Sequence, residues 1–320
     1  MSNDRGEPPV PCLVGPTGSG KSDVGIAIAR RLHAEVVCCD ALTVYRGLSI
    51  LTAKPIAPPD VPHHLLDVVE PDETYSAARF VEDADRLVEA IRARGGVPLI
   101  VGGTALYLKA FGKGLGPRVA RDPDLRRRLE ALAAERGPAA LHERLEAVDP
   151  ARAAEVHAND IRRLVRALEI VEATGGMASA LRREWNAPDR RPIAVVYLRR
   201  TAADLERRLV ARVLAMARAG VVEEVRALLA RERPLSPEAA SAIGFDDLRE
   251  HLEGRLPLEA CLERIVRATR RFTKRQATFF RQFRDATILD LGAEQSTEEV
   301  ADAALLAFAR LGVVPAVRGG

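Results

Sequence analysis

A glycine-rich segment near the amino terminus has the residue types and spacing of a phosphate-binding loop. Residues 15–22 fit the pattern G-x-x-x-x-G-K-[ST]. Glycines there let successive backbone N–H groups point at phosphate oxygens, and the N-terminus of a following helix adds a favourable dipole. The lysine supplies a positive charge, and the final hydroxyl can bind Mg²⁺. The segment therefore predicts a di- or triphosphate site without fixing the reaction; its members are Gly15, Pro16, Thr17, Gly18, Ser19, Gly20, Lys21 and Ser22.

Two polar residues follow apolar runs that are predicted to be strands. Asp40 ends the run Glu35–Cys39, and Thr104 follows the run Val97–Val101. In an open parallel sheet, ligands bind beyond the carboxyl ends of the strands, so both side chains can face the phosphate-binding loop. A carboxylate at Asp40 could bind a metal ion, bind a ribose or accept a proton; alternatively, it only caps the next turn.

Further along the chain, Arg208 and Arg212 are four residues apart in a predicted helix and therefore share a face. One of them could bind a phosphate, while the other could be solvated or ion-paired. The neighbouring histidines His63 and His64 have no Cys or further His nearby. A structural role is therefore expected for them rather than metal ligation.

These residues need a scaffold, and the hydrophobic pattern predicts an α/β fold. Short apolar runs at Val10–Val14, Glu35–Cys39, Val97–Val101 and Ile193–Leu198 are candidate strands, and Lys21–Leu32 and Ser76–Ala93 have helical spacing. Strands that alternate with helices indicate a mainly parallel sheet with helices on both faces. From Arg118 to about Trp185 the strands stop and helical patterns prevail. We therefore expect a core of residues 8–117 and 190–316, interrupted by an all-α insertion of residues 118–189.

Length and composition narrow the class of protein. The 320 residues suggest about two domains. A net charge of +3 excludes a polycation, and 47% hydrophobic residues exclude a wholly disordered chain. No apolar run approaches the roughly 20 residues of a membrane span, and the first eleven residues lack the apolar core of a secretion signal. The four cysteines form no C-x-x-C pair, so we expect buried thiols in a reducing cytoplasm.

One segment is strongly basic. Residues 260–284 contain eight Arg or Lys residues and a single acidic residue, Glu263, for a net charge of +7. Four phenylalanines are interleaved with these cations. Basic and aromatic residues together suit an RNA with unstacked bases. The alternative is an amphipathic helix with a solvated basic face and a phenylalanine core face.

Taken in order, the motifs resemble the tRNA dimethylallyltransferase family, also called the IPP transferase family. The resemblance runs from about residue 11 to residue 284. The motifs that carry it are residues 15–22; Asp40 with 44–47 (Val-Tyr-Arg-Gly) and 52–55 (Thr-Ala-Lys-Pro); 62–65 (Pro-His-His-Leu); 75–78 (Tyr-Ser-Ala-Ala); 101–104 (Val-Gly-Gly-Thr); 159–160 with 163–169; and 267–271 with 274–276.

The resemblance implies a fold similar to that of P-loop nucleoside triphosphatases and a prenyl transfer reaction. Dimethylallyl diphosphate would donate its five-carbon group to N6 of adenosine 37, beside the tRNA anticodon. The loop would hold the diphosphate of this donor, helped by Lys21, by Mg²⁺ at Ser22 and by Arg212. Asp40 would orient the amine and accept its proton, and Thr104 matches an active-site threonine of the family.

The resemblance also implies tRNA contacts and a cytoplasmic, monomeric enzyme whose target base leaves its stack. The matching tRNA-contact positions are Asp40, Ala41, Leu42, Thr43, Arg163, Leu164, Val165, Arg166, Gly244, Arg270, Arg271, Lys274 and Arg275.

The chain departs from the family pattern at several positions. Ala41-Leu42-Thr43 replaces a usual Ser-x-Gln, Ser49 and Leu51 replace Asp and Gly, Phe245-Asp246 replaces Tyr-Arg or Tyr-Lys, and Phe279 stands where Trp is common. Three other functions stay open from the residues alone. They are a small-molecule or nucleotide kinase, a prenyltransferase of free adenine nucleotides, and a non-catalytic RNA-binding protein.

Overall fold

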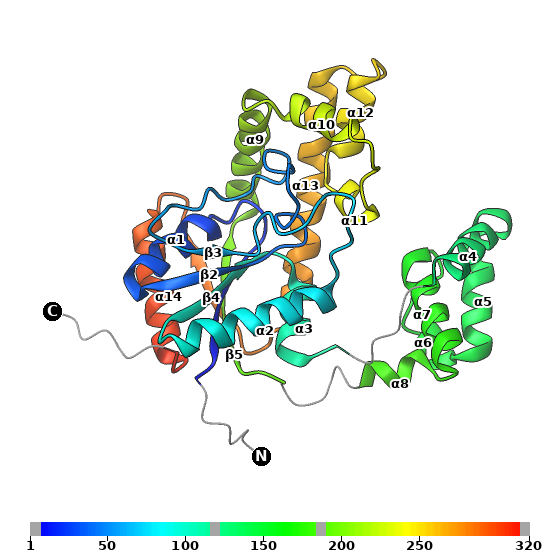
Figure 1. Cartoon of the computed structure of the whole chain (residues 1–320), viewed down its shortest axis with the longest axis horizontal. Coiled ribbons are helices and arrows are strands. Elements are labelled where there is room, and N and C mark those ends of the chain that lie inside the picture. The colour runs from blue at the N-terminus through cyan, green and yellow to red at the C-terminus, as the bar shows by residue number, and fades with distance from the viewer. Residues whose placement is uncertain (1–7, 116–121, 184–189, 314–320) are drawn as a thin grey trace. The chain divides into compact units, whose positions relative to one another are not determined.

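The computed structural model describes residues 8–115, 122–183 and 190–313, which form two compact units (Figure 1). The first unit comprises Met1–Gly112 and Arg191–Gly320, and the second comprises Lys113–Arg190. The predicted borders at residues 117–118, 189 and 316 lie outside the described residues. The borders between the two units fall at Gly112/Lys113 and Arg190/Arg191.

The first unit is built on a six-stranded sheet with the order β3-β2-β4-β1-β5-β6, in which every pairing is parallel. The prediction of a mainly parallel α/β sheet is therefore confirmed. Four strands match predicted ones, and β3 and β6 were not predicted. The strands are β1 (Val10–Val14), β2 (Ala34–Cys39), β3 (His63–His64), β4 (Val97–Gly102), β5 (Ile193–Arg200) and β6 (Thr287–Leu291).

Helices cover this sheet because each has one apolar face. In α2 (Ala77–Ala93), Phe80, Ala84, Val88 and Ile91 are buried, and Ser76 caps the helix by accepting a hydrogen bond from the N–H of Arg79. Helix α2 packs on β2 and β4, and α1 packs against the capped helix α14. The bounds of the other flanking helices are α1 (Lys21–Leu32), α3 (Ala105–Lys113) and α14 (Thr297–Arg310).

A helical layer within the first unit follows the carboxyl end of β5. Helix α13 packs against both α9 and α12, and α10 packs against α9 and α12; these helices group at the top of Figure 1. The layer consists of α9 (Ala202–Arg218), α10 (Val221–Leu229), α11 (Pro237–Ala240), α12 (Phe245–Leu252) and α13 (Leu258–Phe280). After β5 the chain thus forms helices at the carboxyl end of the strands, where the loop of residues 15–20 also lies.

The second unit has its own hydrophobic core, formed by residues such as Leu129, Leu141, Leu145 and Leu164. Its described residues contain helices and no strand, as expected for an all-α insertion. The helices are α4 (Pro123–Arg136), α5 (Pro138–Val148), α6 (Pro150–Ala153), α7 (Ile161–Thr174) and α8 (Ala178–Arg183).

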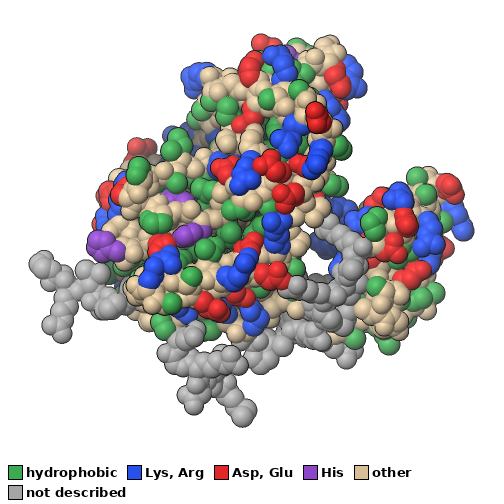
Figure 2. Space-filling view, viewed as in Figure 1, with side chains coloured by type: hydrophobic (Ala, Val, Ile, Leu, Met, Phe, Trp, Pro, Cys, Tyr) green, Lys and Arg blue, Asp and Glu red, His purple; other side chains and the backbone are tan. Residues whose placement is uncertain are grey.

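The surface matches the balanced composition. On the face drawn in Figure 2, basic and acidic side chains are interspersed rather than separated into large single-sign areas. Within the described ranges, no helix combines the length and the apolar character needed to cross a membrane.

Candidate active site

The phosphate-binding loop connects β1 to α1, as its sequence predicts. Gly18 and Gly20 have φ values of 84° and 88°, in the left-handed region where a side chain is strained. Gly20 is also the N-cap of α1 and has no side chain with which to cap the first turn. The N–H groups of that turn are therefore open to an anion.

One pocket of the first unit brings the predicted catalytic residues together. It is lined by Lys21, Ser22, Asp40, Thr104 and Arg212, which come from four different segments around the carboxyl edge of the sheet. The rest of its wall is largely apolar and includes Leu51, Met216, Ile243, Ile265 and Phe272. A pocket with a charged end and an apolar end suits a ligand that carries phosphates on a hydrocarbon group.

Burial alters the acidity of the two cations in this pocket. Burial lowers the pKa of Lys21 to about 8; the nearby carboxylate of Asp40 opposes this change, and the charge of Arg212 adds to it. Burial also lowers the pKa of Arg212, again opposed by Asp40. Both groups would therefore gain from an anion that balances their charge.

Asp40 does cap the turn that follows it, as the simpler interpretation proposed. Its Oδ1 atom accepts hydrogen bonds from the N–H groups of Leu42 (2.9 Å) and Thr43 (3.3 Å). Thr104 supports the same turn, because its Oγ1 accepts a hydrogen bond from the N–H of Ala41 at 3.0 Å. In the part of the chain described, these bonds use Oδ1 alone, so the second carboxylate oxygen is available for a ligand. Capping and catalysis are compatible.

The residues that replace the usual Ser-x-Gln pattern also line the pocket. Ala41, Leu42 and Thr43 are all in its wall. The Thr43 hydroxyl is buried and has no hydrogen-bond partner among the described residues. A buried hydroxyl without a partner is costly, so Thr43 offers the polar contact that a bound base or phosphate would satisfy.

The two arginines on α9 have different partners. Arg212 donates from Nη2 to the carbonyl oxygen of Thr52 at 2.7 Å and lines the pocket. Arg208 donates from Nε to Asp204 at 3.2 Å and is ion-paired. Of the two arginines, only Arg212 therefore lines the pocket that also contains Lys21.

Two residues that the sequence did not single out hold the phosphate-binding loop. The Oε1 atom of Gln276 accepts hydrogen bonds from the backbone N–H of Thr17 (3.0 Å) and from its hydroxyl (3.3 Å), and Nε2 donates to the carbonyl oxygen of Gly103 (2.9 Å). Arg200 is buried and donates from Nε to the carbonyl oxygen of Ser19 at 2.9 Å. In the sequence, Gln276 appeared only within the motif 274–276, and no role was predicted for it.

Most of the basic segment lies in helix α13, which ends at Phe280 and has both of the predicted faces. Its buried face includes Ile265, Thr269, Gln276 and Phe280. Phe280 packs on the ring of Tyr197, with the centroids 5.3 Å apart, so this phenylalanine belongs to the core. The expected tRNA-contact residues lie on the exposed face; they are Arg270, which pairs with Glu206, and Arg271, Lys274 and Arg275.

Three other residues that were expected to contact tRNA are buried in the structure. Leu164 and Val165 are buried in the core of the second unit, whereas Arg163 is exposed and Arg166 pairs with Glu169. Gly244 is buried with a φ of 95°, and a Cβ atom there would lie 2.7 Å from Cδ1 of Ile265. Glycine is needed at this position for packing, and Leu164 and Val165 have core roles.

A divalent cation fits this pocket only together with a phosphate ligand. Among the described residues, no cluster of three or more His, Cys, Asp or Glu could hold a metal ion. Ser22 lines the pocket and offers one hydroxyl oxygen. Phosphate oxygens and water would have to supply the other oxygen ligands that Mg²⁺ prefers.

Comparisons with known proteins agree with this arrangement. Residues 43–283 match the sequence model of the IPP transferase family. The tRNA dimethylallyltransferase of Alkalilimnicola ehrlichii is 44% identical over 288 residues, covering 88% of this chain and 90% of that protein. The corresponding protein of Thiobacillus denitrificans is 44% identical over 314 residues, covering 96% and 98%.

Solved structures show the same likeness. The full-length tRNA isopentenylpyrophosphate transferase of Bacillus halodurans has a TM-score of 0.68 at 32% identity, covering 96% of this chain and 98% of that chain. A eukaryotic dimethylallyltransferase acting on tRNA has a TM-score of 0.77 at 26% identity, covering 97% and 81%. With the pocket, the family match and these relatives in agreement, the chain belongs to the IPP transferase family.

Proposed function

We propose that this protein transfers the dimethylallyl group of dimethylallyl diphosphate to N6 of adenosine 37 in tRNA, forming N6-isopentenyladenosine. The observation that carries the proposal is the single pocket in which Lys21, Asp40 and Arg212 meet beside an apolar wall. The names of the relatives support tRNA as the acceptor. The modification of position 37, and recognition of the anticodon stem-loop, are parts of what we propose.

In the proposed reaction, the bond from C1 of the donor to the diphosphate oxygen breaks and a bond from C1 to N6 forms. Negative charge grows on the diphosphate, where Lys21, Arg212 and the loop N–H groups stabilise it. The allyl carbon becomes positive, and the N6 amine attacks it. The amine proton passes to the carboxylate of Asp40 and then to water. Diphosphate and the modified tRNA are released.

The role of each pocket residue follows from its geometry. Thr104 accepts a hydrogen bond from the N–H of Ala41 and so holds the turn after Asp40. This contact fixes the position of the Asp40 carboxylate, the proposed proton acceptor. Mg²⁺ held by Ser22 and the phosphate oxygens would neutralise part of the leaving-group charge. Adenosine 37 has to leave its stack to reach this pocket. The exposed cations of α13, with Arg163 and Arg166 of the helical insertion, would bind the tRNA backbone.

We also propose how the enzyme binds tRNA, where in the cell it acts and in which oligomeric state. Its helical insertion would bind the anticodon stem-loop, and the enzyme would act as a cytoplasmic monomer. The apolar wall of the pocket, including Met216 and Phe272, would surround the dimethylallyl group and exclude water from the cation.

A labelled-transfer assay tests this function. The protein is incubated with Mg²⁺, unmodified tRNA and dimethylallyl diphosphate labelled in its carbon chain, and the tRNA is digested to nucleosides. Label in N6-isopentenyladenosine at position 37 is expected. Absence of label beside an active control enzyme would refute the proposal. Parallel reactions with γ-labelled ATP and with AMP as acceptor test the kinase and free-nucleotide alternatives.

A further inference from the structure

One carboxylate outside the pocket receives an unusual set of hydrogen bonds. Glu224, in the first turn of α10, accepts hydrogen bonds from the backbone N–H groups of three consecutive residues. Its Oε2 binds the N–H of Ser49 (2.8 Å) and of Ile50 (2.7 Å), and its Oε1 binds the N–H of Leu51 (2.8 Å). Hydrogen bonds to an ionised acceptor are about twice as strong as neutral ones, so these bonds hold the loop firmly.

The loop that Glu224 holds leads directly to the pocket. The next residue, Thr52, accepts at its carbonyl oxygen the 2.7 Å hydrogen bond from Nη2 of Arg212. Leu51, Thr52 and Ala53 all line the pocket. Ala53 has a φ of 42°, which an alanine seldom adopts unless its surroundings hold it there.

The Thr52 carbonyl suits the orientation of a phosphate-binding arginine. A carboxylate partner would neutralise the guanidinium, whereas a carbonyl oxygen fixes its direction and leaves its charge for an anion. Whether Arg212 points correctly therefore depends on where the peptide of Thr52 lies. The three N–H groups just before this peptide all bond to Glu224. The turn itself is closed by the Thr52 hydroxyl, which donates to the carbonyl oxygen of Leu48 (2.5 Å), and by the N–H of Ala53, which donates to that of Ile50 (2.9 Å).

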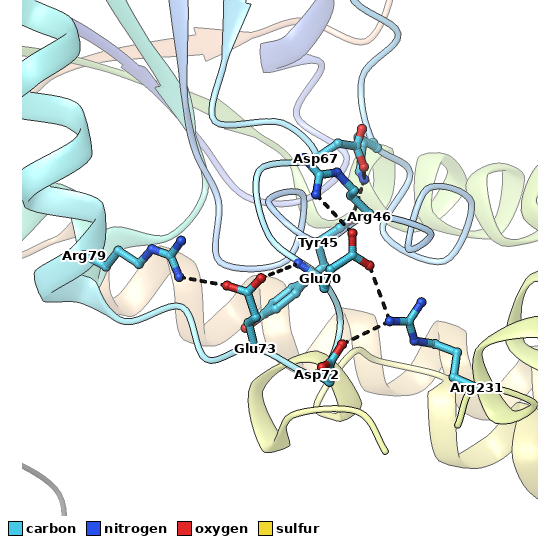
Figure 3. Close-up of polar contacts among 9 residues, drawn as sticks. Tyr45, Arg46, Asp67, Glu70, Asp72, Glu73, Arg79 and Arg231 are labelled. Carbon is cyan, nitrogen blue, oxygen red and sulfur yellow. Dashed lines mark hydrogen bonds and ion pairs between the residues drawn. The ribbon is translucent and has the colours of Figure 1, made fainter. Parts of the chain in front are cut away.

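Other contacts anchor the same segment farther from the pocket. Lys54 donates from Nζ to the carbonyl oxygen of Tyr45 at 2.6 Å and pairs with Asp67. Beyond it, Arg46 pairs with Glu70, and Arg231, which follows α10, pairs with Glu70 and Asp72 (Figure 3). These contacts hold the outer part of the segment, and Glu224 holds the part next to Arg212.

We propose that Glu224 is a positioning residue: it fixes residues 49–51 so that the Thr52 carbonyl directs Arg212 at the diphosphate. This inference rests on the proposed function for its ligand. A glutamine at this position keeps the size of the side chain but replaces one acceptor oxygen by an NH₂ group. That group would face a backbone N–H, two donors would meet, and the loop would shift.

The chain offers a matched control in the neighbouring residue. Glu223 lies in the same first turn of α10, its side chain is 68% exposed, and it pairs at 3.8 Å with Arg226. Glu224→Gln and Glu223→Gln remove the same charge from the same helix end, so both change the helix-dipole energy alike. Only Glu224→Gln disturbs the loop.

The test is a double-mutant cycle read by the binding of inorganic diphosphate with Mg²⁺ in a calorimeter. Glu224→Gln and Arg212→Ala are each expected to raise the Kd about tenfold, the scale of one lost hydrogen bond to a charged group. The double variant should bind no more weakly than Arg212→Ala, because Glu224 acts through that residue. Glu223→Gln should stay within about twofold of the wild type.

Additive effects in the double variant, or a Glu224→Gln affinity equal to that of the wild type, would overturn the inference. Thermal unfolding shows whether Glu224→Gln is folded. If it is not, the cycle is repeated with Glu224→Asp, which keeps the carboxylate. The labelled-transfer assay on the same proteins separates the two ideas. Suppose that the cycle shows the expected coupling between Glu224 and Arg212 but the wild type transfers no label. The proposed function is then refuted, and the positioning role of Glu224 stands.

Discussion

The ammonium group of Lys21 is expected to make donor use fall at alkaline pH. Burial lowers its pKa from the usual 10.5 to about 8, and the charge of Arg212 acts in the same direction. Lys21 must carry its proton to bind the diphosphate. At pH 7 about nine of ten free enzyme molecules are charged at Lys21, and at pH 9 about one in ten is. The kcat/KM for dimethylallyl diphosphate should therefore fall about tenfold between these values.

The assay is kcat/KM for the donor at saturating tRNA and constant ionic strength, from pH 6.5 to 9.5. The bound diphosphate favours the charged lysine, so kcat should fall only at higher pH than kcat/KM does. Arg212→Gln removes a like charge and should raise the apparent pKa seen in kcat/KM, even though the variant is slower. A profile that stays flat to pH 9.5, or a pKa that Arg212→Gln leaves unchanged, would refute this account of the pocket.

Three further predictions concern the base, the helical insertion and the basic helix. Asp40→Asn keeps a capping oxygen but cannot take the proton, so the single-turnover rate constant should fall about 10²- to 10⁴-fold, far more than tRNA affinity in filter binding. Burial alone would raise the pKa of Glu169, but hydrogen bonds from Arg126 and Arg166 outweigh it and lower the pKa. Glu169→Gln should therefore destabilise the helical insertion by about 3 kcal/mol in denaturant unfolding at pH 7. In wild type this stability should be lost as the pH falls below about 4.5, the region where the unfolded carboxylate gains its proton. Lys274→Ala should reduce the slope of log affinity for tRNA against log salt by about one, and an unchanged slope would argue against a phosphate contact.

The elements that sequence periodicity predicts best are those that bury one whole face. Helix α2 was expected to span Ser76–Ala93 and is observed from Ala77, with Ser76 as its cap. Strand β6 was missed because Ile288 is half exposed at the edge of the sheet, and its neighbours do not form a continuous apolar run. Strand β3 has only two residues, His63 and His64, which no periodic pattern can reveal.

The residues of the candidate site were likewise predictable only in part. The phosphate-binding loop, Asp40 and Thr104 were found because each has a local signature at a strand end. Gln276, Arg200 and Glu224 were missed because each binds backbone groups that lie more than 170 residues away in the chain. Backbone atoms are the same in every residue, so the sequence carries no sign of such a contact. Only the folded chain shows which side chain holds which loop.

These three contacts explain how the pocket can keep two cations close together. Burial lowers the pKa of Lys21 and of Arg212, so holding both charges without an anion costs free energy. A loosely held loop would relieve that cost by letting the side chains move apart into water. Gln276 and Arg200 hold the phosphate-binding loop, and Glu224 holds the loop that orients Arg212. The cost is instead relieved when a diphosphate enters, and the relief is larger still when its charge grows in the transition state. If the proposed function holds, catalysis in this pocket would therefore depend on three residues that do not line it.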